Sequence, residues 1–145
     1  MAAVSHAGRW LVLDNRTTAI RAIPGGAKST RVETRLTGAD INPYLAMAAM
    51  LMAGLDGIQN RIDPGAPLDK NIYELPAAEL KKVPSMPGSL NEACDALEKD
   101  HEFLLKGDVF TRDVIETWVA YKREKELDAI RLRPHPNEFT LYFDI

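Results

Sequence analysis

The sequence predicts an α+β fold in which a short antiparallel β-hairpin is followed mainly by helices. Two segments of alternating residues flank Pro24-Gly25-Gly26, which predicts two paired strands around a turn. After residue 42, apolar residues recur at helical spacing in three stretches that proline and glycine residues separate. The chain has 145 residues, which is long enough for one domain with its own core.

The N-terminal part divides into a lead-in and the hairpin. Residues 1–13 carry little periodicity, and we expect an irregular segment there. Residues 18–23 and 30–36 each predict a short strand, with the Pro24-Gly25-Gly26 turn between them. We therefore treat residues 14–145 as the structured unit.

A helix is predicted over residues 42–62. Asn42 is a good N-cap, and Pro43 suits the first turn. The other faces also carry alanine and methionine, so we expect a buried helix at the centre of this chain's core, or of a larger core to which this chain contributes one piece. Its main apolar stripe consists of Tyr44, Met47, Ala48, Leu51, Leu55, Ile58 and Ile62.

The remaining chain predicts a long loop, two more helices and an apolar tail. Residues 63–88 hold five prolines, which favours a surface excursion with at most a short helix near 77–82. Ser89 with Glu92 predicts a capping box, in a helix whose apolar stripe includes Cys94. Thr111 caps the last long helix. The aromatic end at 139–145 must pack into its own fold or into a partner.

Composition excludes several classes of protein. The net charge of −3 argues against a general nucleic-acid binder. A single cysteine, Cys94, rules out a disulfide framework or a cysteine zinc site within one chain. The longest apolar run, Pro43 to Leu55, has 13 residues, whereas a membrane span needs about 20. The N-terminus lacks the apolar core of a signal peptide, so we expect a soluble, cytoplasmic protein.

Basic residues concentrate near the hairpin. Residues 1–40 hold six basic and three acidic side chains, a charge of +3, so the remainder carries −6. Alternation on a strand places Arg31, Glu33 and Arg35 on one face. One interpretation is a surface ion-pair ladder of little energetic weight. The other is a site where arginines bind phosphate or carboxylate oxygens while Glu33 holds Mg²⁺ or Mn²⁺, as phosphoryl transfer requires.

An ordered series of motifs resembles the catalytic domain of bacterial glutamine synthetases. The sequence reads N-R-x-x-x-I-R at 15–21, R-V-E-x-R at 31–35 and N-P-Y-L-A-x-A-A-x-L-x-A-G-L-D-G-I at 42–58. It continues with D-K-N-I-Y-E-L-P at 69–76 and H-P-N-E-F at 135–139. By this resemblance, residues 14–145 are the C-terminal portion of that catalytic domain.

The resemblance implies a role for each matching residue. Arg16 and Arg31 match catalytic arginines that contact the nucleotide phosphates and the transferred phosphoryl group, and Arg21 matches another nucleotide-side arginine. Glu33 matches a glutamate on the second metal ion, and Arg35 matches the arginine that binds the substrate glutamate. The implied enzyme uses ATP and Mg²⁺ or Mn²⁺ to join ammonia to glutamate through γ-glutamyl phosphate.

The same resemblance implies regulation and assembly. Tyr73 lies where one class of these enzymes carries a tyrosine that accepts AMP; the simpler interpretation is an exposed loop tyrosine. The C-terminal tail resembles a segment that inserts into a subunit of the opposite ring. We therefore expect a homo-oligomer, or association with another synthetase subunit, through helix 42–62 and the tail.

Two departures from the family keep alternatives open. The family's other metal ligands and its ammonia site lie upstream of the matching segment, so the chain alone is expected to be incomplete and inactive. A non-catalytic synthetase-like assembly or regulatory protein is one alternative, and a small nucleotide-binding module is a weaker one. The spacing from Arg21 to Arg31 is one residue shorter than in the common bacterial form, and Trp10 to Thr18 resembles divergent synthetase-like members. Some of those members ligate glutamate to other amines, so such a ligase is a further alternative.

Overall fold

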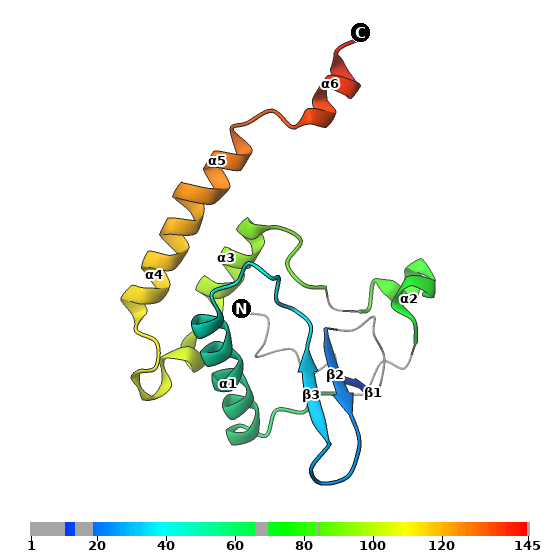
Figure 1. The fold of residues 1–145 in the computed structure, drawn as a ribbon, viewed down its shortest axis with the longest axis vertical. Coiled ribbons are helices and arrows are strands. Elements are labelled where there is room, and N and C mark those ends of the chain that lie inside the picture. The colour runs from blue at the N-terminus through cyan, green and yellow to red at the C-terminus, as the bar shows by residue number, and fades with distance from the viewer. Residues whose placement is uncertain (1–10, 14–18, 66–69, 84, 145) are drawn as a thin grey trace.

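In the described residues, three short strands form a sheet in the order β1-β2-β3. The computed structural model describes residues 11–13, 19–65, 70–83 and 85–144. β2 (Ile20–Ile23) and β3 (Arg31–Thr34) pair antiparallel, which confirms the predicted hairpin (Figure 1). β1 (Leu11–Leu13) pairs parallel with β2 inside the segment expected to be irregular. That expectation does not hold for residues 11–13, because three residues are too few to show an alternating pattern.

The hairpin turn is longer than the Pro-Gly-Gly motif alone. The Gly26 carbonyl accepts hydrogen bonds from the backbone N–H groups of Ser29, at 2.8 Å, and Thr30, at 3.1 Å. The Thr30 hydroxyl donates to the Gly25 carbonyl at 2.9 Å. A Cβ on Gly25 would lie 2.4 Å from the Ser29 hydroxyl oxygen, so a larger residue at position 25 would disturb this turn.

The longest helix, α1, spans Pro43–Gln59 and begins as the sequence predicts. The Asn42 side chain accepts from the backbone N–H groups of Tyr44, at 3.0 Å, and Leu45, at 3.3 Å. Pro43 occupies the first turn, where its missing N–H costs nothing. Within the described residues of the predicted proline-rich excursion, the elements are both short: η3 (Ile72–Glu74) and α2 (Ala77–Leu80).

The C-terminal half consists of helices that follow one another along the chain. They are α3 (Leu90–Lys99), the kinked 3₁₀ segment η4 (Glu102–Asp108), α4 (Arg112–Tyr121), the π-helical segment η5 (Lys122–Leu127), α5 (Asp128–Arg131) and α6 (Pro136–Tyr142). Among them, α4, η5 and α5 are continuous. Figure 1 shows α4 and α5 as one rod that leads away from the other helices, with α6 near its far end.

The predicted capping box at the start of α3 forms in part. The Ser89 hydroxyl accepts from the Glu92 backbone N–H at 3.2 Å. The Glu92 carboxylate, however, accepts from the Gly88 N–H at 2.7 Å. A complete box forms at α6, where the His135 ring and Glu138 are the partners.

The hydrophobic core lies where α1 meets η4 and the start of α4. Small residues on α1 let the other elements approach closely, and Leu104 is 2% exposed. In the described part of the chain, this cluster consists of Ala49, Met52, Ala53, Phe103, Leu104, Phe110 and Ile115.

α1 is buried on one face only within this chain. Ala46, Ala49, Met52 and Ala53 are buried, whereas Leu51 is 65% exposed. The expectation that the whole helix is buried at the centre of this chain's own core therefore does not hold, because only its small residues face the neighbouring elements. The exposed stripe consists of Tyr44, Met47, Leu51, Leu55, Ile58 and Ile62. The alternative of a larger core stays a prediction.

Among the described residues, the C-terminal tail does not pack against the rest of the fold. Every described residue from Ala129 to Asp144 is exposed, and Phe143 is 79% exposed. Packing of this apolar tail into a partner stays a prediction. Among the described residues, no helix has both the length and the apolar character needed to cross a membrane.

Candidate functional site

The hairpin brings three charged side chains together. Arg21 on β2 lies directly opposite Glu33 on β3 in the antiparallel register. Arg31 precedes Glu33 by two residues, so both side chains lie on the same face of β3. The short strands and the tight turn thus fix the position of two guanidinium groups around one carboxylate. We refer to Arg21, Arg31 and Glu33 as the hairpin cluster.

Each carboxylate oxygen of Glu33 accepts from a different arginine. The distance from Arg31 Nε to Glu33 Oε1 is 3.2 Å, and that from Arg21 Nη1 to Glu33 Oε2 is also 3.2 Å. The Arg21 side chain is 18% exposed, whereas those of Glu33 and Arg31 are 37% and 57% exposed. Two guanidinium groups on one partly exposed carboxylate are the kind of arrangement that can bind an anion.

The second arginine that contacts Glu33 is Arg21 and not the expected Arg35. Alternation predicts Arg35 beside Glu33, but β3 ends at Thr34, and the Arg35 backbone N–H donates to the Ala19 carbonyl at 2.8 Å. Arg35 is exposed and follows the cluster along the chain. The cross-strand register supplies Arg21 instead. Counting symmetrically outward from Pro24-Gly25-Gly26 would place Arg21 opposite Ser29, so the turn motif alone does not predict this pairing.

Two further predicted residues lie away from the cluster or outside the described residues. Arg16 belongs to the undescribed range 14–18, so its expected place beside the phosphates has no structural counterpart here. Tyr73 lies in η3, where Asn71 caps its backbone N–H at 3.2 Å. Its side chain is 87% exposed, so an enzyme could reach the phenol.

The donor atoms near Glu33 fit only part of a metal site. Mg²⁺ takes six oxygen ligands, and one carboxylate supplies one or two of them. In the described part of the chain, no three His, Cys, Asp or Glu side chains gather as a metal ligand set. Glu33 can therefore hold a divalent ion only together with ligands from a nucleotide, water or another part of a protein.

An apolar hollow of about 520 Å³ lies between α1, α3 and α4, apart from the hairpin cluster. Cys94 contributes to its wall and is 5% exposed. Burial raises the pKa of the Cys94 thiol above its ordinary value of 9.0, while Arg123 acts in the opposite direction. The thiol is therefore protonated at neutral pH, which agrees with the predicted core role.

One buried charge was not anticipated from the sequence. Asp56 is 8% exposed on the inner face of α1, where it forms an ion pair with Lys106 of η4. Asn60 also donates to the Asp56 carboxylate, at 2.8 Å. Asp56 lies within the L-D-G sequence of the helix, and an acid between apolar residues was the available signal. The pair fastens α1 to η4.

Comparisons with known proteins agree with the motif series. The family model described as "Glutamine synthetase, catalytic domain" matches residues 6–142. Curated proteins named glutamine synthetase are 62% identical in Frankia alni, 56% in Aquifex aeolicus and 50% in Mycobacterium bovis. Each match covers 90% of this chain but only 28% of the relative. The chain thus belongs to the glutamine synthetase family and corresponds to part of its catalytic domain.

Proposed function

We propose that this chain is part of an ATP-dependent glutamate–ammonia ligase and contributes the arginines of its phosphoryl-transfer site. The observation that carries the proposal is the hairpin cluster, in which Arg21 and Arg31 surround Glu33 on one accessible face. Family membership supports the assignment, because the cluster falls within the segment that matches the catalytic domain. The proposed cellular location is the cytoplasm.

The reaction would proceed in two steps. The γ-carboxylate of glutamate attacks the terminal phosphorus of ATP, which forms γ-glutamyl phosphate and releases ADP. Ammonia then attacks the acyl carbon, inorganic phosphate leaves, and the nitrogen loses a proton to give glutamine. Arg16, Arg21 and Arg31 would bind phosphate oxygens through both steps, because guanidinium groups stabilise the charge of the moving phosphoryl group.

Glu33 and Arg35 would have separate tasks. Glu33 would contribute one ligand to Mg²⁺ or Mn²⁺, which neutralises phosphate charge when bound. Its two arginine contacts hold the carboxylate in place until a nucleotide competes for the guanidinium groups. Arg35 is exposed beyond the strand end, where it would bind a carboxylate of the substrate glutamate. Tyr73 is the candidate modification site, since its phenol is accessible.

The proposed partners cover the exposed apolar surfaces. The chain has an accessible surface of 10821 Å². A compact monomer of 16.1 kDa exposes about 7,400 Å² by the general scaling of area with mass. The outer stripe of α1 and the aromatic residues of α6 supply apolar surface for contact with other parts of a synthetase, or with a second copy.

A chimera tests the proposal, because the chain spans 28% of its relatives. Residues 6–142 would replace the matching segment of the Frankia alni glutamine synthetase, and ATP-dependent glutamine formation would be measured. We expect activity in the chimera, and a loss of about 10²–10³-fold in kcat for Glu33→Ala. Glu124→Ala, which removes an exposed acid distant in sequence from the hairpin, is the matched control and should retain activity.

Three outcomes would overturn the assignment. A chimera that assembles and binds ATP but forms no glutamine would favour an assembly or regulatory role. Activity only with methylamine or ethylamine would instead identify a ligase for another amine. If Glu33→Ala abolishes folding, as measured by circular dichroism, then Glu33 is structural and the site assignment fails.

A further inference from the structure

A single helical rod connects the packed helices to the C-terminal tail. It runs through α4, η5 and α5, from Arg112 to Arg131, and leads away from the other helices (Figure 1). The side of α4 that carries Ile115 and Val119 is buried against the body of the molecule. We call residues Asp128–Asp144 the C-terminal arm; beyond Asp128 every described residue in it is exposed.

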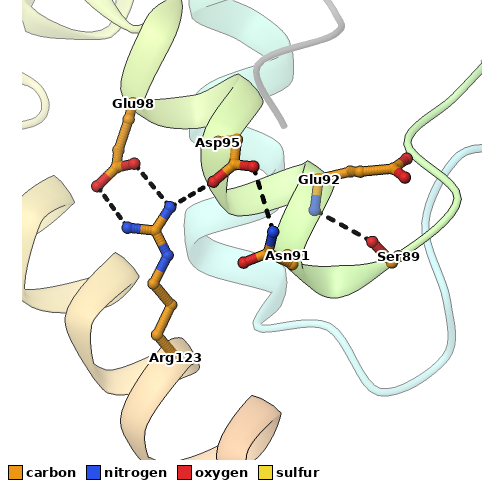
Figure 2. Close-up of polar contacts among 6 residues, drawn as sticks. All are labelled: Ser89, Asn91, Glu92, Asp95, Glu98 and Arg123. Atoms are coloured by element: carbon orange, nitrogen blue, oxygen red, sulfur yellow. Dashed lines mark hydrogen bonds and ion pairs between the residues drawn. The ribbon is translucent and has the colours of Figure 1, made fainter.

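Arg123 joins this rod to α3 just before the arm begins. Its Nη1 atom donates to Glu98 Oε1 at 2.9 Å, and Nη2 donates to Glu98 Oε2 at 2.7 Å. Nη2 also donates to Asp95 Oδ1 at 2.5 Å (Figure 2). A guanidinium group presents two parallel donors in one plane, so this two-pronged contact fixes the orientation of the arginine as well as its position.

The acidic partners are themselves held in place. Asp95 and Glu98 are three residues apart on α3, so they lie on the same side of that helix. The Asn91 side chain donates to Asp95 Oδ2 at 3.3 Å, and Ser89 caps the start of the helix (Figure 2). The contact therefore links Arg123 to a rigid element and not to a loop.

The π-helical geometry of η5 gives this contact a consequence for the arm. A π turn holds more residues than an α turn, so it rotates everything that follows about the rod axis. The neighbouring Lys122 pairs with Glu126 along the rod, at 2.5 Å, and lies over the Trp118 ring at 4.8 Å. Among the described residues, the ion pair that follows η5 joins Arg131 to Asp128, and both of these residues belong to the arm. Among the ion pairs of the described residues, those of Arg123 are thus the last along the chain to join the rod to the body.

We propose that Arg123 is a positioning residue that sets the direction of the C-terminal arm. The contact with Asp95 and Glu98 holds the rod against α3 and so sets the direction in which the chain leaves the body toward α6. The consequence for docking rests on the partner role of the tail proposed above, whereas the orientation of the arm is a property of this chain alone. High salt weakens the link, since its groups are partly exposed.

A distance measurement between two spin labels tests the orientation. Labels would be attached at Lys99→Cys on α3 and Ala129→Cys on α5, both exposed positions, in the Cys94→Ala background. We expect one narrow distance distribution with Arg123 present and its loss in Arg123→Ala. Arg123→Lys should be intermediate because an ammonium group cannot make the two-pronged contact. The matched control Arg131→Ala removes an arginine whose partner lies in the arm, and the distribution should stay narrow.

Salt provides a second readout. Sodium chloride at about 1 M, where the Debye length is about 3 Å, should broaden the distribution of the chain that retains Arg123 and add nothing to Arg123→Ala. An unchanged narrow distribution in Arg123→Ala would overturn the proposal. If Arg123→Ala loses helical circular dichroism, the double variant Asp95→Asn with Glu98→Gln decides, because it keeps both side-chain sizes and removes both charges; a narrow distribution there also overturns the proposal.

Light scattering on the same samples separates this inference from the proposed docking role. A broadened distance with an unchanged assembled mass would support the positioning by Arg123 and refute a docking role for the arm. A distance distribution that stays narrow in Arg123→Ala would refute the positioning role of Arg123, whatever the assembled mass.

Discussion

The packed helices and the C-terminal arm have similar kinds of residues but opposite environments. Around Leu104, apolar side chains of α1, η4 and α4 exclude water, and the side chain is 2% exposed. In α6, Leu141 is 60% exposed although it also lies among aromatic neighbours. Apolar composition alone therefore does not identify a core residue. What decides is whether other elements of the same chain approach from several directions, and in the arm none does among the described residues.

The largest expected difference between the two regions concerns leucine truncation. Leu104→Ala should lower the free energy of unfolding by about 2–4 kcal/mol, because it leaves a cavity in the core. Leu141→Ala should change it by less than about 0.5 kcal/mol, because the side chain is already in water. Urea denaturation of both variants measures the two values. Equal losses would mean that the arm packs in solution against a surface of its own chain.

A smaller difference is expected for acidic residues in ion pairs. Asp56→Ala should cost about 1–2 kcal/mol, because it leaves Lys106 and Asn60 without their acceptor at a buried position. The expected loss in the free energy of unfolding is modest because the Lys106 side chain is 47% exposed. Asp128→Ala in the arm should cost under about 0.5 kcal/mol, since its partner Arg131 is exposed. Thermal unfolding of both variants checks this order, and a larger loss for Asp128→Ala would contradict it.

Buried and exposed cysteine side chains should differ least in their effect on stability and most clearly in their reactivity. Burial raises the pKa of Cys94, so the folded thiol resists ionisation and reacts slowly with a disulfide reagent at pH 8. A cysteine introduced by Thr140→Cys in the exposed arm should react rapidly. As the pH rises, the thiol of the unfolded chain ionises before that of the folded chain. The contribution of the buried Cys94 thiol to stability is therefore complete below the ordinary pKa of 9.0 and is lost as the pH rises through the pKa of the folded state. Cys94→Ala should abolish that alkaline loss; rapid reaction of native Cys94 would refute its burial.

The helical elements could be predicted from local signals in the sequence. The Asn42-Pro43 start of α1 and the Ser89 cap of α3 depend on neighbouring residues alone, so the sequence contains the information that defines them. The face that α1 buries was not predictable in this way. Alanine and methionine face inward because η4 and α4 approach that side, and this is a tertiary event. Periodicity shows that a helix has apolar faces, not which one is covered by its own chain.

The candidate site shows the same division. Arg31 and Glu33 share a strand, and alternation places them together. Arg21 joins them only through the register of the hairpin, which depends on a turn that is longer than its Pro-Gly-Gly motif. The link from Arg123 to α3 spans 25 or more residues, so no local pattern could have predicted it.

The two apolar faces of α1 also bear on how this chain behaves before it meets a partner. The inner face is covered as soon as η4 and α4 fold back, whereas Tyr44, Leu51 and Ile58 stay in water. Such an exposed apolar surface associates non-specifically with other chains during synthesis and promotes aggregation at high concentration. Production of the chain by itself should therefore yield mostly insoluble material, and co-expression with whatever covers α1 should recover soluble protein. The order in which the parts meet, and not only their final contacts, would then determine the yield of active enzyme.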